Sequence, residues 1–450
     1  MVKGSMEHEI MTDTKIQHPI WDPEHESMPR EQLRALQLRR LRDMVRRLHQ
    51  RVPFYKQRLD AAGVSPDDIR TLDDVRRIPF TCKQDLRDHY PYGMLAVPLS
   101  EAARLHCSTG TTGKPTVVAY TRRDLDTWAD LVARLIVAAG VRSDDLVHVA
   151  FGYGLFTGGL GLHYGMERVG ACVLPVSGGN TDRQVQLLRD LRPTVLVCTP
   201  SYSLHIAEML AATGGSPRDI ALRVGLFGGE PWSENLRREI ETRLGISATD
   251  NYGLSEIIGP GVSGECLEKR GMHLHEDHFL VEHIHPETGE PAAPGDVGEL
   301  VITPLTREAF SVLRYRTRDL CRLIEEPCPC GRTSLRMTKV IGRTDDMLII
   351  RGANIFPSQV EQVLLDMGGV EPHYLLVADR KGALDELEIK VEIAPEFFSD
   401  EMKQLRQKEV EIERRLRTSL GVSFKLTLVE SGTLERGSGK AKRVLDLRSR

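Results

Sequence analysis

A short segment rich in glycine and hydroxyl side chains is the most chemically distinctive part of the sequence: Ser108-Thr109-Gly110-Thr111-Thr112-Gly113-Lys114-Pro115. Glycines let successive backbone N–H groups turn toward an anion, and the hydroxyl groups supply further donors. Lysine adds a compact positive charge. This combination predicts a loop that binds a polyphosphate, although a generic turn could have the same composition.

Two common nucleotide-binding motifs are excluded by the residues at their fixed positions. A Walker loop has a first glycine separated by four residues from its Gly-Lys pair and a hydroxyl residue after that pair, whereas Ser108 and Pro115 stand at these positions. A second segment, Gly152-Tyr153-Gly154, lacks the third glycine of a dinucleotide fingerprint, because Thr157 takes its place. The loop therefore represents another kind of phosphate site.

The elements that would position this loop follow an α/β pattern. A chain of 450 residues is too long for one hydrophobic core, so two or more domains are expected. Apolar runs at 146–150, 194–198 and 223–227 predict buried strands, and the stretches 182–191 and 201–212 predict helices between them. This alternation is typical of a layered α/β domain with mostly parallel sheets.

The C-terminal part of the chain has a different pattern. Its predicted elements have the order β-α-β-β-α-β of a small split βαβ domain: strand 346–350, helix 357–367, strands 373–379 and 386–394, helix 399–420 and strand 424–430. Pro357 suits a first helical turn, and Ser399 is expected to cap the long helix. A glycine-rich segment, 432–440, follows and should be mobile. We therefore expect domains at 1–344 and 345–450.

Charge and hydropathy exclude several classes of partner. The formal net charge is -4, so nucleic acid is not an expected partner. An arginine-rich stretch at 29–51 has an apolar stripe, which favours a packed helix with a solvated basic face. No apolar run approaches the roughly 18 residues of a membrane helix, and residues 1–18 do not form a secretory signal. We expect a cytoplasmic protein without a membrane partner.

The order of residues in the loop resembles the phosphate loop of the adenylate-forming superfamily. Further motifs of that superfamily follow in its usual order, namely Tyr252-Gly253-Leu254-Ser255-Glu256, Tyr315-Arg316-Thr317-Arg318-Asp319, Gly342-Arg343-Thr344-Asp345-Asp346 and Ser438-Gly439-Lys440. Other segments resemble the phenylacetate-CoA ligase family in particular, such as Ile20-Trp21-Asp22-Pro23, Glu276-Asp277-His278-Phe279 and Arg351-Gly352-Ala353-Asn354-Ile355-Phe356-Pro357. The resemblance covers nearly the whole chain.

The resemblance implies an enzyme with ATP, Mg²⁺ and coenzyme A as cofactors and an aromatic carboxylic acid as substrate. Such an enzyme converts the acid into its acyl-adenylate and then into the CoA thioester, releasing pyrophosphate and AMP. Members of the family are typically homodimers. Two alternatives remain: adenylation of a hydroxy- or aminobenzoate with CoA or another acceptor, and a catalytically silent relative. Intact Glu256, Asp319 and Lys440 argue against the silent relative.

The resemblance also implies roles for residues in the nucleotide site. Residues 108–113 and Ser255 would contact phosphate, and the catalytic residues would be Lys114, Glu256 and Lys440. Glu256 would hold Mg²⁺ through a carboxylate oxygen, a ligand that this hard cation prefers. Lys440 would reach both the α-phosphate and the carboxylate of the acid.

The adenosine would be held by a second group of residues. The adenine pocket would be Gly229-Glu230-Pro231, which follows a predicted strand end, where ligands bind in α/β sheets. Tyr252 would cover the adenine face, and its neighbours Asn251 and Gly253 would also bind the cofactor. Asp319 would accept hydrogen bonds from the ribose hydroxyls, and Arg343 would hold ribose or phosphate. Asp345 would be the hinge between domains, and Gly352 would face the channel for CoA.

Aromatic residues are rare in this chain, at 5%, yet three occur together after a predicted strand. Phe151, Tyr153 and Phe156 could line a slot for an aryl acid. Core packing is the alternative, above all for Tyr153. Pro260 is expected in the same pocket.

Four cysteine and histidine residues predict a structural zinc site. Cys328 and Cys330 form a close pair, and Cys266 precedes His273 by seven residues. Three thiolates and one imidazole suit tetrahedral Zn²⁺ and fill its coordination, as structural sites do. His275 is the alternative nitrogen ligand, and free buried thiols are the alternative to a metal site.

Overall fold

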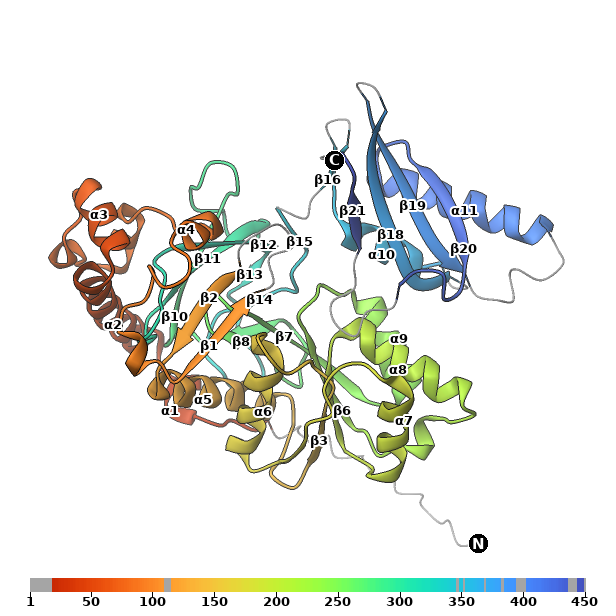
Figure 1. The fold of residues 1–450 in the computed structure, drawn as a ribbon, viewed down its shortest axis with the longest axis horizontal. Coiled ribbons are helices and arrows are strands. Elements are labelled where there is room, and N and C mark those ends of the chain that lie inside the picture. The colour runs from red at the N-terminus through yellow and green to blue at the C-terminus, as the bar shows by residue number, and fades with distance from the viewer. Residues whose placement is uncertain are drawn as a thin grey trace, which may run out of the picture.

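The computed structural model describes residues 18–108, 115–344, 348–350, 353–367, 370–381, 384–393, 402–435 and 443–448. We call residues 18–344 the large part and residues 348–448 the small part. In Figure 1 the large part runs from red to cyan, and the blue small part lies beside its green helices. Within the described ranges, no helix is both long and apolar enough to cross a membrane.

The N-terminal helices form one side of the large part. They are α1 Pro23–Glu26, α2 Arg30–Arg51, α3 Pro53–Ala61 and α4 Lys83–Asp88, with short 3₁₀ turns at Pro66–Asp68 and Leu72–Arg77. The arginine-rich helix predicted at 29–51 is α2. Its apolar stripe is buried, and its arginines Arg30 and Arg40 pair with Glu276 and Asp277. The basic face is thus matched by carboxylates of the same chain.

A nine-stranded sheet forms the centre, in the order β13-β14-β9-β8-β7-β6-β5-β3-β4. The strands β3 Leu146–Val149, β4 Cys172–Leu174, β5 Val195–Cys198, β6 Val224–Gly228 and β7 Ser247–Leu254 are parallel. The strands β8 Gly259–Glu265, β9 Met272–Leu274, β13 Leu323–Ile324 and β14 Arg336–Met337 extend it antiparallel. The predicted parallel arrangement is therefore confirmed for β3 to β7 only.

Helices cover both faces of the parallel strands, because neighbouring residues of a strand point to opposite sides. In β5, Val195 and Val197 pack in the core with α5 Arg122–Ala138 and α6 Thr157–Val169, while Leu196 and Cys198 pack with helices of the other face. Those helices are α7 Thr181–Asp190, α8 Pro200–Ala212 and α9 Glu234–Leu244. The predicted strands and helices of this region are confirmed, and α/β is the fold class.

Antiparallel strands complete the large part. The hairpin β1 Arg104–Ser108 and β2 Thr116–Tyr120 flanks the glycine-rich loop. A four-stranded sheet has the order β10 Phe279–Ile284, β11 Gly298–Pro304, β12 Tyr315–Cys321 and β15 Gly342–Arg343. The described strand pairings of the large part outside β3 to β7 are therefore antiparallel, and the expectation of mostly parallel sheets holds only for β3 to β7. The sequence did not indicate the antiparallel strands, because short strands joined by turns do not alternate with helices.

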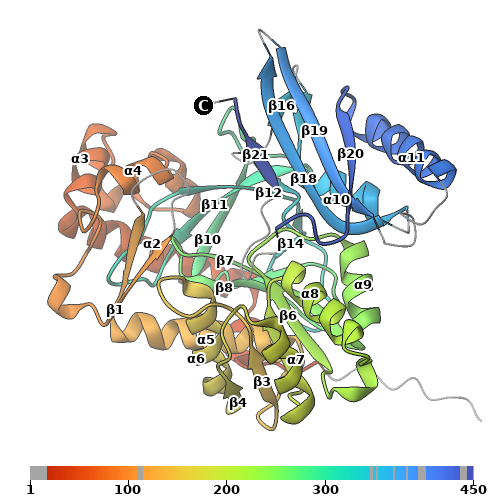
Figure 2. The same cartoon turned by 45° about the vertical axis from the view of Figure 1, so that its right-hand side comes forward.

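The small part contains α10 Pro357–Leu365, α11 Met402–Leu420 and a sheet in the order β20-β19-β18-β21. Its strands are β18 Val370–Lys381, β19 Leu384–Ile393, β20 Lys425–Glu430 and β21 Val444–Asp446. Figure 2 shows α11 lying across this sheet. The predicted α+β succession is confirmed, and Pro357 opens α10. Ser399 lies outside the described residues.

One strand of the small part differs from the prediction. The described part of the strand predicted at 346–350 is β16 Leu348–Ile350, which pairs with β17 Ala353–Ile355 and not with the main sheet of the small part. The fourth strand of the sheet is β21, which pairs parallel with β18. β21 has only three residues, too few for the alternating pattern that identifies a strand in a sequence.

Candidate active site

The predicted adenine residues lie at the carboxyl ends of two parallel neighbours, β6 and β7. Gly228, the last residue of β6, is paired with Asn251, and the Asn251 amide donates to the carbonyl oxygen of Phe227 at 2.6 Å. A side chain at Gly228 would overlap the backbone of Asn251, so only glycine allows this close approach. The segment Gly229-Glu230-Pro231 follows at once. In it, Glu230 accepts a hydrogen bond from the backbone N–H of Ser201 in α8, 2.7 Å away.

Three of the predicted residues meet around one buried carboxylate. The Tyr252 hydroxyl donates to Oδ2 of Asp319 at 2.6 Å, and Arg343 donates to Oδ1 at 2.8 Å. Strand pairing sets this geometry, because Asp319 in β12 lies directly opposite Arg343 in β15. Burial and the charge of Asp319 raise the pKa of Tyr252, which keeps the phenol protonated as a donor. The hydroxyl contact was missed from the sequence, which indicated only the ring.

The predicted Mg²⁺ ligand lies just beyond β7 and already faces a cation. Glu256 is buried, and its Oε1 lies 3.6 Å from Nζ of Lys83, the first residue of α4. Thr81, two residues before Lys83, is bridged to Tyr315, the first residue of the motif that ends at Asp319. Lys83 was missed from the sequence because no motif includes it. The one local signal is its place in the first turn of a helix, where a positive charge is unfavourable.

The neighbouring Ser255 connects the Mg²⁺ motif to the other helix layer. Its hydroxyl lies 3.0 Å from Oγ1 of Thr157, the first residue of α6. Thr157 therefore brings the Ser255 hydroxyl to the start of a helix, where backbone N–H groups favour an anion. The sequence indicated Ser255 as a phosphate contact and gave no reason to select Thr157.

The glycine-rich loop begins and ends in the β1–β2 hairpin. Ser108 ends β1 and is paired with Thr116 of β2, whose N–H lies 3.4 Å from the Ser108 hydroxyl. Residues 109–114, including Lys114, lie outside the described residues. The hairpin is tied to the predicted substrate loop, because the carbonyl oxygen of Leu155 accepts from the Cys107 N–H and lies 3.0 Å from Nδ1 of His106. Burial lowers the pKa of His106, so the neutral imidazole can donate there.

The residues predicted for the aryl acid do not share one environment. Phe151 and Tyr153 are partly buried against the main core, and the Tyr153 hydroxyl lies 3.1 Å from Nδ1 of His163. Phe156 is 51% exposed at the start of α6. Pro260 is buried and lies opposite Gly253 in the β7–β8 pairing, which places it beside the nucleotide motif.

An aromatic layer that the sequence did not indicate underlies Pro260. Trp128 of α5 donates from its indole N–H to the carbonyl oxygen of Pro260 at 2.6 Å. The ring of Tyr120 stacks on Trp128 with centroids 4.9 Å apart, and His106 meets Trp128 edge-on. These rings come from β1, β2 and α5, which are far from Pro260 in the sequence, so only the tertiary fold brings them together.

The four predicted metal ligands form a compact buried cluster. The ligand atoms of Cys266, His273, Cys328 and Cys330 all lie within 4.8 Å of one another. Sγ of Cys266 and Sγ of Cys328 are 3.8 Å apart, which is the edge of a tetrahedron with bonds of about 2.3 Å to zinc. Nε2 of His273 lies 3.4 Å from Sγ of Cys330, and its Nδ1 lies 3.3 Å from the Ser334 hydroxyl. Such a second contact is expected to hold a histidine ligand in orientation.

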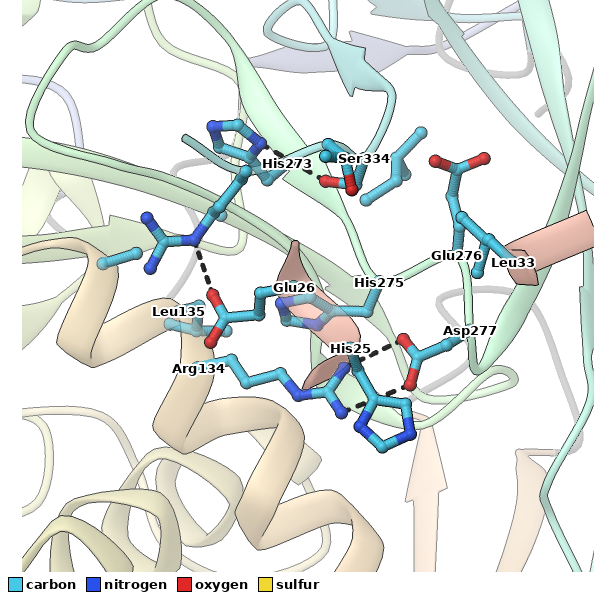
Figure 3. Close-up of a pocket in the computed structure, with 15 residues that line it drawn as sticks. His25, Glu26, Leu33, Arg134, Leu135, His273, His275, Glu276, Asp277 and Ser334 are labelled. Atoms are coloured by element: carbon cyan, nitrogen blue, oxygen red, sulfur yellow. Dashed lines mark hydrogen bonds and ion pairs between the residues drawn. The ribbon is translucent and has the colours of Figure 1, made fainter. Parts of the chain in front are cut away.

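His275, the alternative ligand, lies elsewhere. Its Nδ1 is 2.8 Å from the carbonyl oxygen of Gly261, and it belongs to a small cavity next to the cluster (Figure 3). This cavity of about 20 Å³ has room for roughly one water molecule and none for a substrate. Its walls carry buried ion pairs: Arg134 contacts Asp277 at 2.8 Å and Asp22 at 2.7 Å. These ion pairs connect the N-terminal segment to α5, so the residues around the cavity serve the structure of the large part.

The residues predicted for the hinge, the CoA channel and the C-terminal lysine motif are Asp345, Gly352 and Lys440. All three lie outside the described residues. The described residues nearest to them in sequence are Thr344, Ala353 and Arg443.

Comparisons with known proteins match this arrangement of residues. A family model described as AMP-binding enzyme matches residues 58–304, and one described as AMP-binding enzyme C-terminal domain matches residues 352–448. The phenylacetate-coenzyme A ligase of Thermus thermophilus is 52% identical over 443 residues, covering 95% of this chain and 100% of that protein. The chain belongs to the phenylacetate-CoA ligase family. It is an AMP-forming acid–CoA ligase of the adenylate-forming class, which depends on ATP, Mg²⁺ and CoA.

Solved structures of a related ligase indicate which arrangement of the two parts this phenylacetate-CoA ligase relative adopts. A crystal structure of 2-hydroxyisobutyryl-CoA ligase in the postadenylation state, in complex with 2-HIB-AMP, has a TM-score of 0.90, with 30% identity, 100% of this chain covered and 96% of that chain. The same ligase in the thioesterification state with 2-HIB-AMP and CoA has a TM-score of 0.71, with 32% identity and coverages of 95% and 92%. The present arrangement therefore matches the postadenylation state better.

We predict that Tyr252→Phe weakens ATP binding, because Asp319 then loses the hydrogen bond from the Tyr252 hydroxyl inside a buried site. Loss of a hydrogen bond to a charged group costs about 1.5–3 kcal/mol, so the KM for ATP should rise roughly 10- to 100-fold. Steady-state kinetics with varied ATP measures this. Tyr55→Phe is the matched control, since its buried hydroxyl contacts Thr81 outside the nucleotide site. An unchanged KM for ATP in Tyr252→Phe would contradict the assignment.

Proposed function

We propose that this acid–CoA ligase acts on phenylacetate, giving phenylacetyl-CoA, AMP and pyrophosphate. The observation that carries the proposal is the 52% identity to a phenylacetate-coenzyme A ligase over 95% of the chain. The cluster of Tyr252, Asp319 and Arg343 supports it, because these residues form a polar site suited to a ribose on the edge that carries Glu256. The same edge carries Pro260 on its aromatic layer, which suits a flat, apolar acid.

In the proposed first step, a carboxylate oxygen of the acid attacks the α-phosphorus of ATP, and the bond to the β-phosphate oxygen breaks. Pyrophosphate leaves, and the acyl-adenylate keeps the AMP portion. Charge stabilisation and positioning dominate such a reaction. We assign the β- and γ-phosphates to residues 108–114 with Ser255, and the ribose to Asp319 and Arg343. Mg²⁺ bound at Glu256 would neutralise phosphate charge.

The second step needs a second arrangement of the two parts. We propose that the boundary lies between residues 344 and 345, with Asp345 as the hinge, Lys440 acting in adenylation, and Gly352 facing CoA. The higher TM-score to the postadenylation state than to the thioesterification state supports the first arrangement for the present structure. The CoA thiol then gives its proton to solvent and its sulfur attacks the acyl carbon. The bond from that carbon to the phosphate oxygen breaks, and AMP leaves as a dianion.

The aryl ring would lie between the loop after β3 and the turn between β7 and β8. Phe151 and Pro260 supply partly buried and buried apolar surface there. We assign Tyr153 to the pocket wall by its ring, since its hydroxyl is held by His163. Phe156 is half exposed and would contact the acid only from the pocket rim.

A panel of acids tests the substrate. We expect phenylacetate to support ATP–pyrophosphate exchange at least about tenfold faster, in kcat/KM, than benzoate, hydroxybenzoates or aminobenzoates, because the extra methylene places the ring deeper by one bond. Thioester formation should require CoA. Lys440→Ala should lower exchange by about 100-fold or more. A preference for a benzoate, or exchange without any thioester product, would refute phenylacetate–CoA ligation.

We further propose a structural Zn²⁺ at Cys266, His273, Cys328 and Cys330. Its ligands are buried and apart from the strand ends that hold the nucleotide residues, so it would brace the loop around Cys330 and take no part in catalysis. Arg332 of that loop pairs with Glu26 at 2.5 Å, which connects the site to the N-terminal segment.

The zinc proposal predicts one metal ion per chain. Elemental analysis of purified protein should find about one zinc, and Cys330→Ser should lose it and melt about 5 °C or more below wild type. Cys172→Ser is the matched control, because that thiol is exposed and outside the cluster. Absence of stoichiometric metal in the wild type would contradict the site.

Two further properties complete the proposal. We propose a cytoplasmic homodimer. None of the eight cysteines forms a disulfide, which agrees with a reducing compartment. ATP and CoA are also intracellular substrates. Sedimentation equilibrium at micromolar concentration should give twice the chain mass, and a monomer would contradict the dimer. Cell fractionation that placed the protein outside the cytoplasm would contradict the location.

A further inference from the structure

The large and small parts of the chain meet at α8 and α9, next to the segment 229–233 that carries the predicted adenine pocket. Glu361 of α10 accepts a hydrogen bond from the backbone N–H of Ser233, 3.0 Å away. Asp366 at the end of α10 accepts from the Asn235 amide, and His373 of β18 lies 3.2 Å from Glu208 of α8. Figure 2 shows α10 and β18 next to α8 and α9.

Among these contacts, the one made by Glu361 is the most deeply buried. Its side chain is 6% exposed, and burial raises the pKa of this carboxyl, opposed by Arg443 and by the Ser233 N–H. Ser233 is the N-cap of α9, and it follows Gly229-Glu230-Pro231 by two residues. Glu361 is therefore bonded to the same short connection that carries the predicted adenine pocket.

Inside the small part, Glu361 is held from its other oxygen. Arg443 lies 3.9 Å from Oε2 of Glu361, and its guanidinium lies over the Tyr374 ring, 4.4 Å from the centroid. The Tyr374 hydroxyl donates to the carbonyl oxygen of Pro357 at 2.8 Å, and the Arg443 carbonyl oxygen accepts from the Leu376 N–H at 2.9 Å. The carboxylate thus has one oxygen toward each part of the chain.

We propose that Glu361 is a positioning residue for adenylation. It binds Ser233 and so holds the small part against the segment 229–233, while Arg443 fixes the orientation of the Glu361 side chain. The inference rests on the proposed function. A contact shifts an equilibrium between two arrangements only if its strength differs between them. Ser233 and Glu361 belong to different parts, so any rotation of one part against the other breaks the bond. Glu361 therefore stabilises the adenylation arrangement and contributes nothing to the thioester-forming one.

Separate assays of the two half-reactions test this role. Glu361→Ala should lower phenylacetate-dependent ATP–pyrophosphate exchange about 10- to 100-fold, the range expected for a lost hydrogen bond to a charged group. Thioester formation from synthetic phenylacetyl-adenylate and CoA should stay within about twofold of wild type or increase. Glu361→Gln keeps an oxygen acceptor for Ser233 and loses the ion pair, so its loss in exchange should be smaller, and it preserves side-chain volume if the alanine variant does not fold.

Glu413→Ala is the matched control, because this α11 residue pairs with the neighbouring Arg417 on the surface of the small part. It should leave both half-reactions unchanged. Equal losses in both half-reactions for Glu361→Gln, or no loss in exchange for Glu361→Ala, would overturn the positioning role.

A measurement without substrates separates this inference from the proposed function. Small-angle X-ray scattering should show a larger radius of gyration for Glu361→Ala than for wild type, because the small part is released from the large part. Unchanged scattering would overturn the inference, whatever the substrate. If wild-type protein gave no exchange with phenylacetate, the proposed function would fail, while the scattering comparison would still decide the role of Glu361 in docking.

Discussion

The buried carboxylate of Asp319 is the constraint on which the arrangement of the site depends. A carboxylate whose side chain is only 6% exposed is stable only if both oxygens find partners. Tyr252 near the end of β7 binds one oxygen, and Arg343 in β15 binds the other. These partners lie in two different sheets, and Arg343 is the last residue of β15, the final strand of the large part. One charge therefore holds the parallel strand ends, the antiparallel sheet and the connection to the small part in a fixed relation.

Two other carboxylates, one in the large part and one in the small part, lie next to cations from distant segments. Glu256 faces Lys83 of the N-terminal helices, and Glu361 faces Arg443 near the C-terminus. Each pair joins segments that are far apart in the sequence. Interactions of this kind are worth more in a partly buried site than in water, because the effective dielectric constant is lower.

The sequence was sufficient to predict features that depend on local patterns. Glu256, Asp319 and the strand end near Gly229 were predicted as site residues from short ordered strings, and the structure places Asp319 beside Tyr252 and Arg343, while their roles stay predictions. The helices on either side of β5 followed from apolar periodicity. The contacts between distant segments were not predictable in this way. Lys83, Trp128 and Glu361 occupy ordinary helical positions, and their partners are set by tertiary packing that periodicity does not report. Short strands such as β21 and β14 were missed because two or three residues show no alternation.

The most direct test of adenylate formation at this site follows one oxygen atom. With phenylacetate labelled by ¹⁸O in both carboxylate oxygens, attack on the α-phosphorus leaves one labelled oxygen on the phosphate when CoA takes the acyl group. Mass spectrometry of the products of a complete reaction with ATP and CoA should find one ¹⁸O in each AMP and none in pyrophosphate. Unlabelled AMP, or label in inorganic phosphate, would contradict the mechanism.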